Sequence, residues 1–358
     1  MTRVRLVVAA WVIALLTLAS CDAKPTGRAH PSPAKTPSGC VSDTRCPSKR
    51  IEEGLAFDQD RQTLVLFAGS RSPDTVAGGG LSVLGDTWEW HLGSGWVQLH
   101  PAISPPARTA ATMVYDPATH QSLLLGGSYT VGGTVACDEF GQVLCSNDMW
   151  AWNGTDWTEL HARGNPILYG STAAYDQATR SVLLYTFDFG IYKMWTLSRG
   201  TWASKPGLPS PGRVKPSMTF DPATRHSLLF GGFSQGAGNL AAMWTWSGRG
   251  WARLGVNAPL DRFQRSAATG WFDGRGILAY QNPEYDGNPP NQVRQVRSQT
   301  WRWGGTRWTK LKPEHDPDLF VSAMFDDPKG HRVLMVGVDL NGSLQIWAWS
   351  GSDWGRIG

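Results

Sequence analysis

The chain has 358 residues, of which 17% are charged, and its formal net charge is +4. This near-neutral balance, with no basic run interleaved with aromatic residues, excludes an ordinary nucleic-acid-binding protein. Aromatic residues are abundant and include 19 tryptophans, whose spacing carries most of the structural information.

The first 20 residues predict a secretory signal peptide. Arg3 and Arg5 precede an apolar run over residues 6–18, which is too short for a good membrane span. The Leu-Ala-Ser sequence directly before Cys21 resembles a bacterial lipoprotein signal, in which Cys21 is lipidated and becomes the mature N-terminus. A plain signal peptide with an incidental cysteine is the alternative.

Residues 21–49 predict a lipidated cysteine followed by a Pro-rich tether. Residues 22–39 contain mainly Pro, Lys, Ala, Ser and Thr, a composition that cannot form a hydrophobic core. We therefore expect a folded domain that is lipid-anchored to the outer face of the bacterial cytoplasmic membrane. The lipid is the only membrane contact that we expect.

Four cysteines remain after Cys21, and an even number in an exported chain indicates disulfides. The local pairs Cys40–Cys46 and Cys137–Cys145 are favoured over the other two connectivities because each closes a short loop. A metal site at one of these pairs is the alternative. No histidine or second cysteine pair stands beside either pair at ligand spacing, so we expect no metal.

Residues 108–160 show the unit from which the rest of the chain is built. Tyr115 ends a β-type run, and the Asp-Pro-Ala-Thr that follows predicts a tight turn into the run that ends at Gly126-Gly127. A second hairpin is expected around Asn153-Gly154. Such a four-stranded antiparallel unit cannot bury its own faces, so it needs similar neighbours.

Three registers show that the unit occurs six times. The first is an aromatic-Asp pair at the first turn, 45 to 60 residues apart: Phe57-Asp58, Tyr115-Asp116, Tyr175-Asp176, Phe220-Asp221, Phe272-Asp273 and Phe325-Asp326. The second is a Trp-x-Trp pattern at residues 88, 150, 195, 244, 301 and 347, with leucine at its second position in the third copy. The third is Trp96, Trp157, Trp202, Trp251, Trp308 and Trp354; only Trp11 and Trp271 fall outside these registers.

Six four-stranded repeats predict one all-β domain over residues 50–358, a six-bladed β-propeller. The expected blades are about residues 50–100, 108–161, 168–206, 213–255, 265–312 and 318–358. Both terminal repeats are complete, so we expect the last blade to pack on the first, braced by the Cys40–Cys46 segment. We expect a monomer.

The arginine, the aromatic-Asp turn, the Leu-Leu-Leu-Gly-Gly strand, Trp-x-Trp and Gly-x-Trp closely resemble the kelch repeats of bacterial kelch and galactose-oxidase-like propellers. The resemblance implies the fold, whereas that family hosts many unrelated functions. Copper chemistry of the galactose-oxidase kind would need two histidines, tyrosines and a Cys-Tyr partner. Because these ligands are not recognisable, we expect no cofactor.

The longest predicted loops indicate which face binds a ligand. Connections between the second and third strands of a blade are long at residues 70–86, 128–147 and 281–298, and they share a face with the blade-to-blade links. The candidate ligand-binding residues in these loops are Tyr129, Asp138, Tyr285, Asp286 and Arg294.

A further set of candidates stands eight residues before each turn aspartate. This register contains Arg50, Arg108, Leu168, Arg213, Arg265 and Asp318. Four arginines at one level could form a positive channel mouth that binds carboxylates or phosphates. The structural interpretation, which we favour, is that each arginine bonds to carbonyls of the adjacent blade.

The sequence thus predicts a membrane-anchored binding or scaffolding propeller whose partner is a cell-envelope glycan or a protein. The alternative is a carbohydrate-active hydrolase or lyase that uses acidic loop residues such as Asp138, Glu139 and Asp286. Assembly of a membrane complex through the flat face is a third possibility. No catalytic residue can be assigned from the sequence.

Overall fold

The computed structural model describes part of the chain, all of it within the unit Pro37–Gly358. The described residues are 46–71, 82–128, 130–131, 134–135, 145–164, 166, 168, 171–188, 191–207, 213, 216–234, 238–259, 269–271, 276–286 and 293–358. The signal, Cys21 and the tether up to residue 45 lie outside them. Within the described part, no helix is long and apolar enough to cross a membrane.

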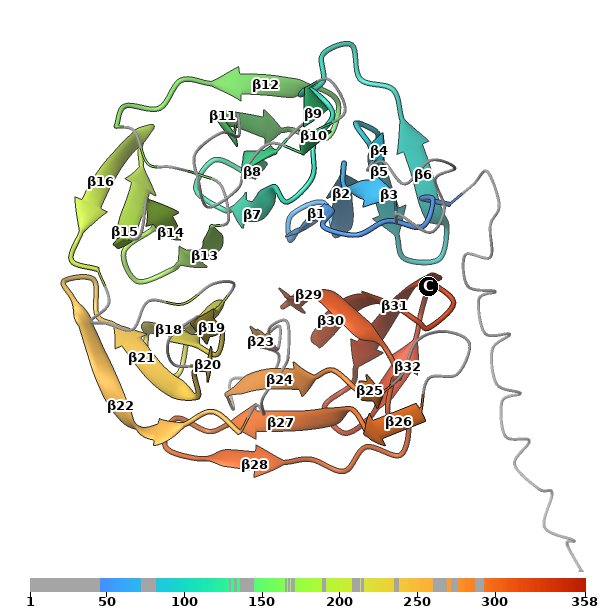
Figure 1. Ribbon diagram of the computed structural model, residues 1–358, viewed down its shortest axis with the longest axis vertical. Coiled ribbons are helices and arrows are strands. Elements are labelled where there is room, and N and C mark those ends of the chain that lie inside the picture. The colour runs from blue at the N-terminus through green and yellow to red at the C-terminus, as the bar shows by residue number, and fades with distance from the viewer. Residues whose placement is uncertain are drawn as a thin grey trace, which may run out of the picture. The chain divides into compact units, whose positions relative to one another are not determined.

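Six four-stranded antiparallel sheets surround a central axis (Figure 1). Blades 1 to 3 consist of β1 (Gly54–Asp58), β2 (Thr63–Phe67), β5 (Thr87–His91) and β6 (Gly95–Leu99); β7 (Thr112–Asp116), β8 (Gln121–Ser128), β11 (Cys145–Trp152) and β12 (Trp157–Leu160); β13 (Thr172–Asp176), β14 (Ser181–Asp188), β15 (Ile191–Ser198) and β16 (Thr201–Lys205). Blades 4 to 6 consist of β17 (Ser217–Asp221), β18 (His226–Phe230), β21 (Ala242–Trp246) and β22 (Trp251–Asn257); β23 (Thr269–Trp271), β24 (Ile277–Gln281), β27 (Gln299–Trp303) and β28 (Trp308–Lys310); β29 (Phe320–Asp327), β30 (Arg332–Val338), β31 (Leu344–Trp349) and β32 (Trp354–Arg356).

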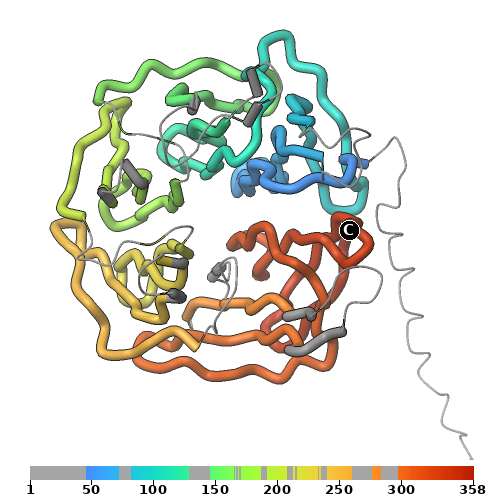
Figure 2. Tube along the Cα trace, in the orientation of Figure 1, coloured from blue at the N-terminus to red at the C-terminus, as the bar shows by residue number. Residues whose placement is uncertain are grey.

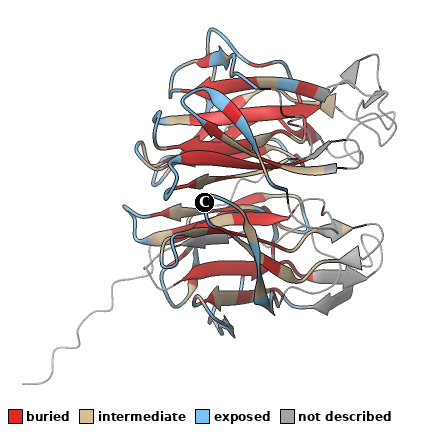
Figure 3. Cartoon of the chain, turned by 90° about the vertical axis from the view of Figure 1, so that its left-hand side faces the viewer, coloured by how far each residue is buried: buried red, intermediate tan, exposed pale blue. Residues whose placement is uncertain are grey.

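In each blade the four strands follow one another in sequence order, and we name them A to D from the axis outward. The prediction of an all-β, six-bladed propeller is therefore confirmed. Because neighbouring strands are antiparallel, the A–B turns lie at one end of the blade and the B–C connections at the other. Burial is concentrated in the strands, and exposed residues gather at the turns (Figure 3).

In blades 1 to 4 the A–B turns form where the sequence predicts them, because an aspartate ends strand A and accepts a bond from the backbone of the turn. The Asp58 Oδ1 atom accepts from the N–H of Asp60 over 3.0 Å, and that of Asp116 accepts from the N–H of Ala118 over 2.9 Å. Asp176 and Asp221 form equivalent bonds. Local side-chain chemistry therefore sets the register of strands A and B.

A separate hydrophobic cluster fills each of the six interfaces between neighbouring blades. In blades 2, 3, 5 and 6 the tryptophan of strand D also reaches the preceding blade through its indole N–H. Trp157 donates to the hydroxyl of Thr87 over 3.0 Å, and Trp354 donates to that of Thr300 over 2.9 Å. The tryptophans are therefore structural parts of the blade interfaces, as their spacing predicts.

The ring closes where blade 6 packs against blade 1, which lie side by side in Figure 2. Their shared cluster contains Leu55, Phe57, Leu64, Leu66, Trp88, Trp90 and Trp96 from blade 1 and Leu334, Val336, Leu344 and Ile346 from blade 6. The Gln59 side chain also donates to the backbone oxygen of Asp326 over 3.3 Å. The last blade thus packs on the first without exchange of strands.

The backbone register of blade 6 differs from the one that the sequence suggests. Asp327, rather than Asp326, ends strand A in the position of Asp116, because it pairs with Arg332 and accepts the N–H of Gly330 over 2.8 Å. A β-bulge between Val321 and Ala323 supplies the extra residue. Asp326 thereby moves into the position that an aromatic residue holds in the preceding blades.

In blade 5 the sequence places Phe272-Asp273 at the A–B turn, and these two residues lie outside the described part. Trp271, which fell outside the predicted registers, pairs with Ile277 as Tyr115 pairs with Ser122 in blade 2. The backbone register therefore assigns the aromatic position of this strand A to Trp271.

Candidate functional site

Two-stranded ribbons extend the B–C connections of four blades. They are β3 (Ser70–Arg71) with β4 (Ser82–Val83), β9 (Thr130–Val131) with β10 (Thr134–Val135), β19 (Phe233–Ser234) with β20 (Gly238–Asn239), and β25 (Glu284–Asp286) with β26 (Val293–Val296). In blade 3 only residues 189–190 separate strands B and C. The two ends of the propeller therefore differ, with short A–B turns at one and extended ribbons at the other.

The arginine that precedes strand A is buried and bonded within its own blade in blades 1 and 2. Arg50 is 4% exposed, donates to the Ala68 carbonyl oxygen over 2.9 Å, and binds both carboxylate oxygens of Asp86 over 2.7 Å. Arg108, which is fully buried, forms the same bonds to Gly126 and Asp148. The expected bonds to carbonyls of the adjacent blade are therefore replaced by bonds inside the blade.

The aspartates of these pairs are also held by the tryptophan two residues later, since Trp88 donates to Asp86 and Trp150 to Asp148. Burial opposes ionisation of the Asp148 carboxyl, yet the hydrogen bonds and charge of Arg108 hold its pKa below the ordinary value. The guanidinium groups are thus committed to the fold, and we assign them no part in ligand binding.

Arg213 of blade 4 has carbonyl oxygens as its described partners instead of an aspartate. Arg213 is 2% exposed and donates to the carbonyl oxygens of Gly231 and Ala242 over 3.1 and 3.0 Å. Ala242 stands two residues before Trp244, where blades 1 and 2 have their aspartates. Burial lowers the pKa of Arg213 because no described carboxylate pairs with it. Arg265 lies outside the described residues.

Two of the candidate loop residues, Tyr129 and Asp138, lie outside the described part of the chain. Tyr285 and Arg294 stand directly opposite each other in the ribbon β25–β26, and Asp286 stands opposite Val293. The structure thus brings Tyr285 and Arg294 together along the backbone, as neighbours across one ribbon.

Cys46 is disulfide-bonded, as the sequence predicts for an exported chain. Its expected partner, Cys40, lies outside the described residues. Cys145 begins strand β11 opposite Ser128, and its expected partner Cys137 again lies outside the described residues. The two pairings therefore remain predictions.

A groove of about 210 Å³ lies between blades 2 and 3, where the D–A link 161–168 leaves strand β12. It is lined by Asn147, Asp148, Glu159, His161, Leu168 and Trp202, among others. Trp202 is anchored by its indole N–H on the sulfur of Met149, and Asn147 accepts the N–H of Leu168 over 3.0 Å. Glu159 and His161 are exposed at the rim. The lining thus combines exposed hydrogen-bonding groups with the indole of Trp202, which is 5% exposed.

The groove and the place of His161 at its rim were not predicted from the sequence. The groove depends on the path of the link and on Trp202 of the next blade, which are distant in sequence from Asn147. The sequence also gave no sign of Glu53, whose pKa is raised by burial although Ser322 of blade 6 bonds to it. Tertiary packing, rather than a local motif, creates both features.

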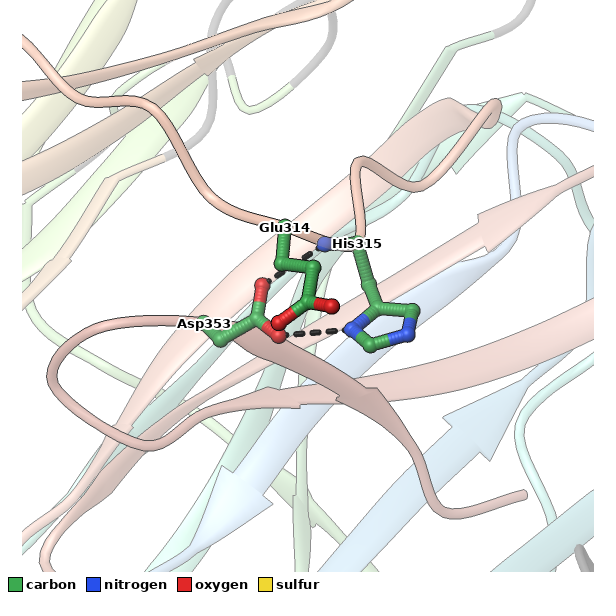
Figure 4. A group of neighbouring side chains, drawn as sticks. All are labelled: Glu314, His315 and Asp353. Carbon is green, nitrogen blue, oxygen red and sulfur yellow. Dashed lines mark hydrogen bonds and ion pairs between the residues drawn. The ribbon is translucent and has the colours of Figure 1, made fainter.

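Glu314, His315 and Asp353 form a cluster with metal-ligand types near the periphery (Figure 4). The Asp353 carboxylate binds the backbone N–H of His315 over 2.8 Å and the imidazole Nδ1 over 2.6 Å. Asp156 in blade 2 binds the backbone N–H of Ala102 in the same way. This contact is therefore a recurring tie between a C–D turn and the preceding link, and the described geometry favours that structural role over metal binding.

Comparison with known proteins gives the fold and little else. No protein-family model and no curated protein matches the chain. A solved structure described as "Structure of YjhT" aligns with a TM-score of 0.60 and 10% identity over 88% of this chain and 99% of that chain. A fungal alcohol oxidase of the AA5 family, solved with copper, aligns with a TM-score of 0.49 and 11% identity over 81% of this chain and 59% of that chain. The protein is thus a six-bladed β-propeller, similar in fold to the YjhT structure.

Proposed function

We propose that this protein is a lipid-anchored, extracytoplasmic binding propeller that recognises a cell-envelope glycan through the groove between blades 2 and 3. The observation that carries the proposal is the groove itself, whose lining combines the polar side chains of Asn147, Glu159 and His161 with the indole of Trp202. Sugars are bound by this combination of hydrogen-bonding groups and an aromatic surface.

The setting of the groove also supports binding rather than turnover. Asp148, the carboxylate on its inner side, is already held by Arg108, Ser146 and Trp150, so it is poorly placed to exchange a proton during catalysis. The acids proposed for a hydrolase or lyase, Asp138 and Glu139, lie outside the described residues. Of the two carboxylates that line the groove, Asp148 and Glu159, the first is engaged in these bonds, so the binding function is better supported than glycoside hydrolysis by a carboxylate pair.

The disulfide at Cys46 supports an oxidising compartment, and the sequence before Cys21 supports lipid attachment. Replacement of Cys21 by serine should move the protein from the membrane fraction to the soluble fraction. If Cys21→Ser protein stays in the membrane fraction after a high-salt wash, the proposed anchor is wrong.

Glycan binding is tested by an array screen with the full-length protein, followed by titration of any glycan retained. We expect Glu159→Gln and His161→Ala to weaken binding at least tenfold. His100→Ala is the matched control, because His100 is exposed at the corresponding place after strand β6 and does not line the groove. Equal losses in all three variants, or no glycan retained, would argue against this site.

A further inference from the structure

A second cavity lies in the centre of the ring, at the A–B turn end and therefore away from the B–C ribbons. Its volume is about 190 Å³, and it is lined by A strands of blades 1, 2, 3, 4 and 6 together with turn residues such as Gln59 and Gln177. A cavity of about 150 Å³ is large enough for benzene. This cavity could therefore hold a compact organic molecule with an aromatic ring.

In the five blades that line this cavity, one position of strand A is aromatic in four blades and acidic in the fifth. Phe57, Tyr115, Tyr175 and Phe220 hold the same position in strand A, one residue before the turn aspartate. In blade 6 that position belongs to Asp326, which pairs with Val333 as Phe57 pairs with Leu64. The bulge between Val321 and Ala323 thus places a carboxylate among the aromatic residues and moves Phe325 one residue back.

One oxygen of the Asp326 carboxylate is not used by the fold. Its Oδ1 atom is buried and has no hydrogen-bond partner, whereas the neighbouring Asp327 binds the backbone of Gly330 and the guanidinium of Arg332. A buried carboxylate oxygen without a partner is costly, and native proteins usually satisfy such atoms. An oxygen of this kind at the wall of a cavity is therefore suited to a ligand that donates a hydrogen bond.

We propose that the central cavity binds a small organic ammonium ion, whose N–H groups meet Asp326 and whose carbon skeleton lies among Phe57, Tyr115, Tyr175, Phe220 and Phe325. The faces of aromatic rings attract cations, and the carboxylate adds charge complementarity and an acceptor. This site is separate from the groove between blades 2 and 3 and does not depend on the proposed glycan function.

The affinity of this cavity for an ammonium ion should increase with pH. Burial, with a smaller contribution from the charge of Asp327, raises the pKa of Asp326 to about 7. The described ionisable groups near this end of the cavity include Tyr115 and Tyr175, which line it, and Asp58, Asp60, Asp116, Asp176, His120, Arg180 and Lys329 around them. A cation binds the ionised form of Asp326, so affinity should rise as pH increases through 7 and then level off.

The test is calorimetric titration of the full-length protein with benzylammonium, and with benzyl alcohol as a neutral molecule of the same shape. At pH 8 we expect benzylammonium to bind at least tenfold more tightly than benzyl alcohol, and at pH 5.5 we expect this preference to disappear. Asp326→Asn should abolish the preference at both pH values without loss of benzyl alcohol binding.

Several results would overturn the proposal. They are equal affinity of the wild-type protein for the two molecules at pH 8, no binding of benzylammonium at millimolar concentration, and an unchanged preference in folded Asp326→Asn. The pH series on the wild-type protein decides the matter even if the variant fails to fold. Loss of glycan binding in the groove variants would have no bearing on this outcome.

Discussion

The indole N–H of Trp157 in blade 2 donates to the hydroxyl of Thr87 in blade 1 over 3.0 Å. Trp96, the corresponding residue of blade 1, is 8% exposed and its buried N–H has no hydrogen-bond partner. The residue that corresponds to Thr87 in blade 6 is Ile346, which offers no side-chain acceptor. The tryptophan of strand D therefore gains a hydrogen bond at the interface of blades 1 and 2 that it lacks at the interface of blades 6 and 1.

We predict that Trp157→Phe destabilises the protein by about 1–2 kcal/mol more than Trp96→Phe does. Both changes remove similar aromatic area, but only Trp157→Phe removes a hydrogen bond and leaves the buried Thr87 hydroxyl without its donor. Chemical denaturation of the two variants measures the difference. Equal losses of unfolding free energy would show that the bond contributes nothing net.

Alanine substitutions at Gly126 and Gly231 compare a glycine at a packed blade interface with one in open space. Both have left-handed backbone, with φ of 58° and 71°, and Ala68 holds the corresponding position in blade 1 with φ of 66°. A Cβ atom on Gly126 would lie 2.6 Å from the Cβ atom of Leu168, whereas nothing lies within 4 Å of one on Gly231. Gly231→Ala should cost only the backbone strain, about 1–2 kcal/mol.

Gly126→Ala should cost roughly 3 kcal/mol or more, because backbone strain is joined by a clash at a packed interface. Thermal unfolding of the two variants measures this contrast. A Gly126→Ala protein as stable as Gly231→Ala would mean that the link at Leu168 moves away freely.

Replacement of the buried arginines Arg108 and Arg213 should cost different amounts of unfolding free energy, because only Arg108 is paired with a described aspartate. Arg108→Met leaves Asp148 without its charged partner, and we expect a loss of roughly 2–4 kcal/mol at pH 7. Arg213→Met removes a buried cation that has no described carboxylate partner, so its cost should be about 1 kcal/mol or less. Denaturant unfolding of both variants at pH 7 provides the measurement.

The cost of Arg108→Met should also depend on pH. The pKa of Asp148 is lowered in the folded state, so the stability it contributes is present above its ordinary value of 3.8 and is lost as pH falls through the folded value. The difference between wild type and Arg108→Met should therefore shrink at pH 3. A constant difference from pH 7 to pH 3 would contradict the ion pair.

The fold could be predicted because its determinants are local and repeated. Turn aspartates such as Asp116 cap their own turns, and tryptophans such as Trp157 recur at fixed distances from them. The Asp-x-Trp pattern at Asp86 and Asp148 also contained the partners of the two buried arginines, which were not recognised from sequence. The groove at Trp202 could not be predicted, because it depends on how a link passes between two blades.

Asp326 was misplaced for a different reason. The aromatic-Asp pattern fits Phe325-Asp326, and a one-residue bulge leaves no clear mark in such a pattern. The informative signal was the Asp-Pro pair, since Asp116-Pro117 and Asp221-Pro222 correspond to Asp327-Pro328. Register in a β-sheet decides which face every side chain takes, so one extra residue changed a turn residue into a cavity residue.

The adjacent carboxylates Asp326 and Asp327 should therefore respond in opposite ways to removal of their charge. Asp327→Asn weakens the bonds to Gly330 and Arg332, and we expect a loss of about 2 kcal/mol at pH 7. Asp326 has a raised pKa in the folded state, so its contribution to stability is complete below pH 3.8 and is lost as pH rises through about 7. Asp326→Asn should remove that loss and be more stable than wild type at pH 8, by a few kcal/mol at most. Unfolding free energies measured from pH 4 to pH 8 should thus decrease for the wild type relative to Asp326→Asn; parallel curves would mean that Asp326 is an ordinary solvated carboxylate and that the cavity does not hold it.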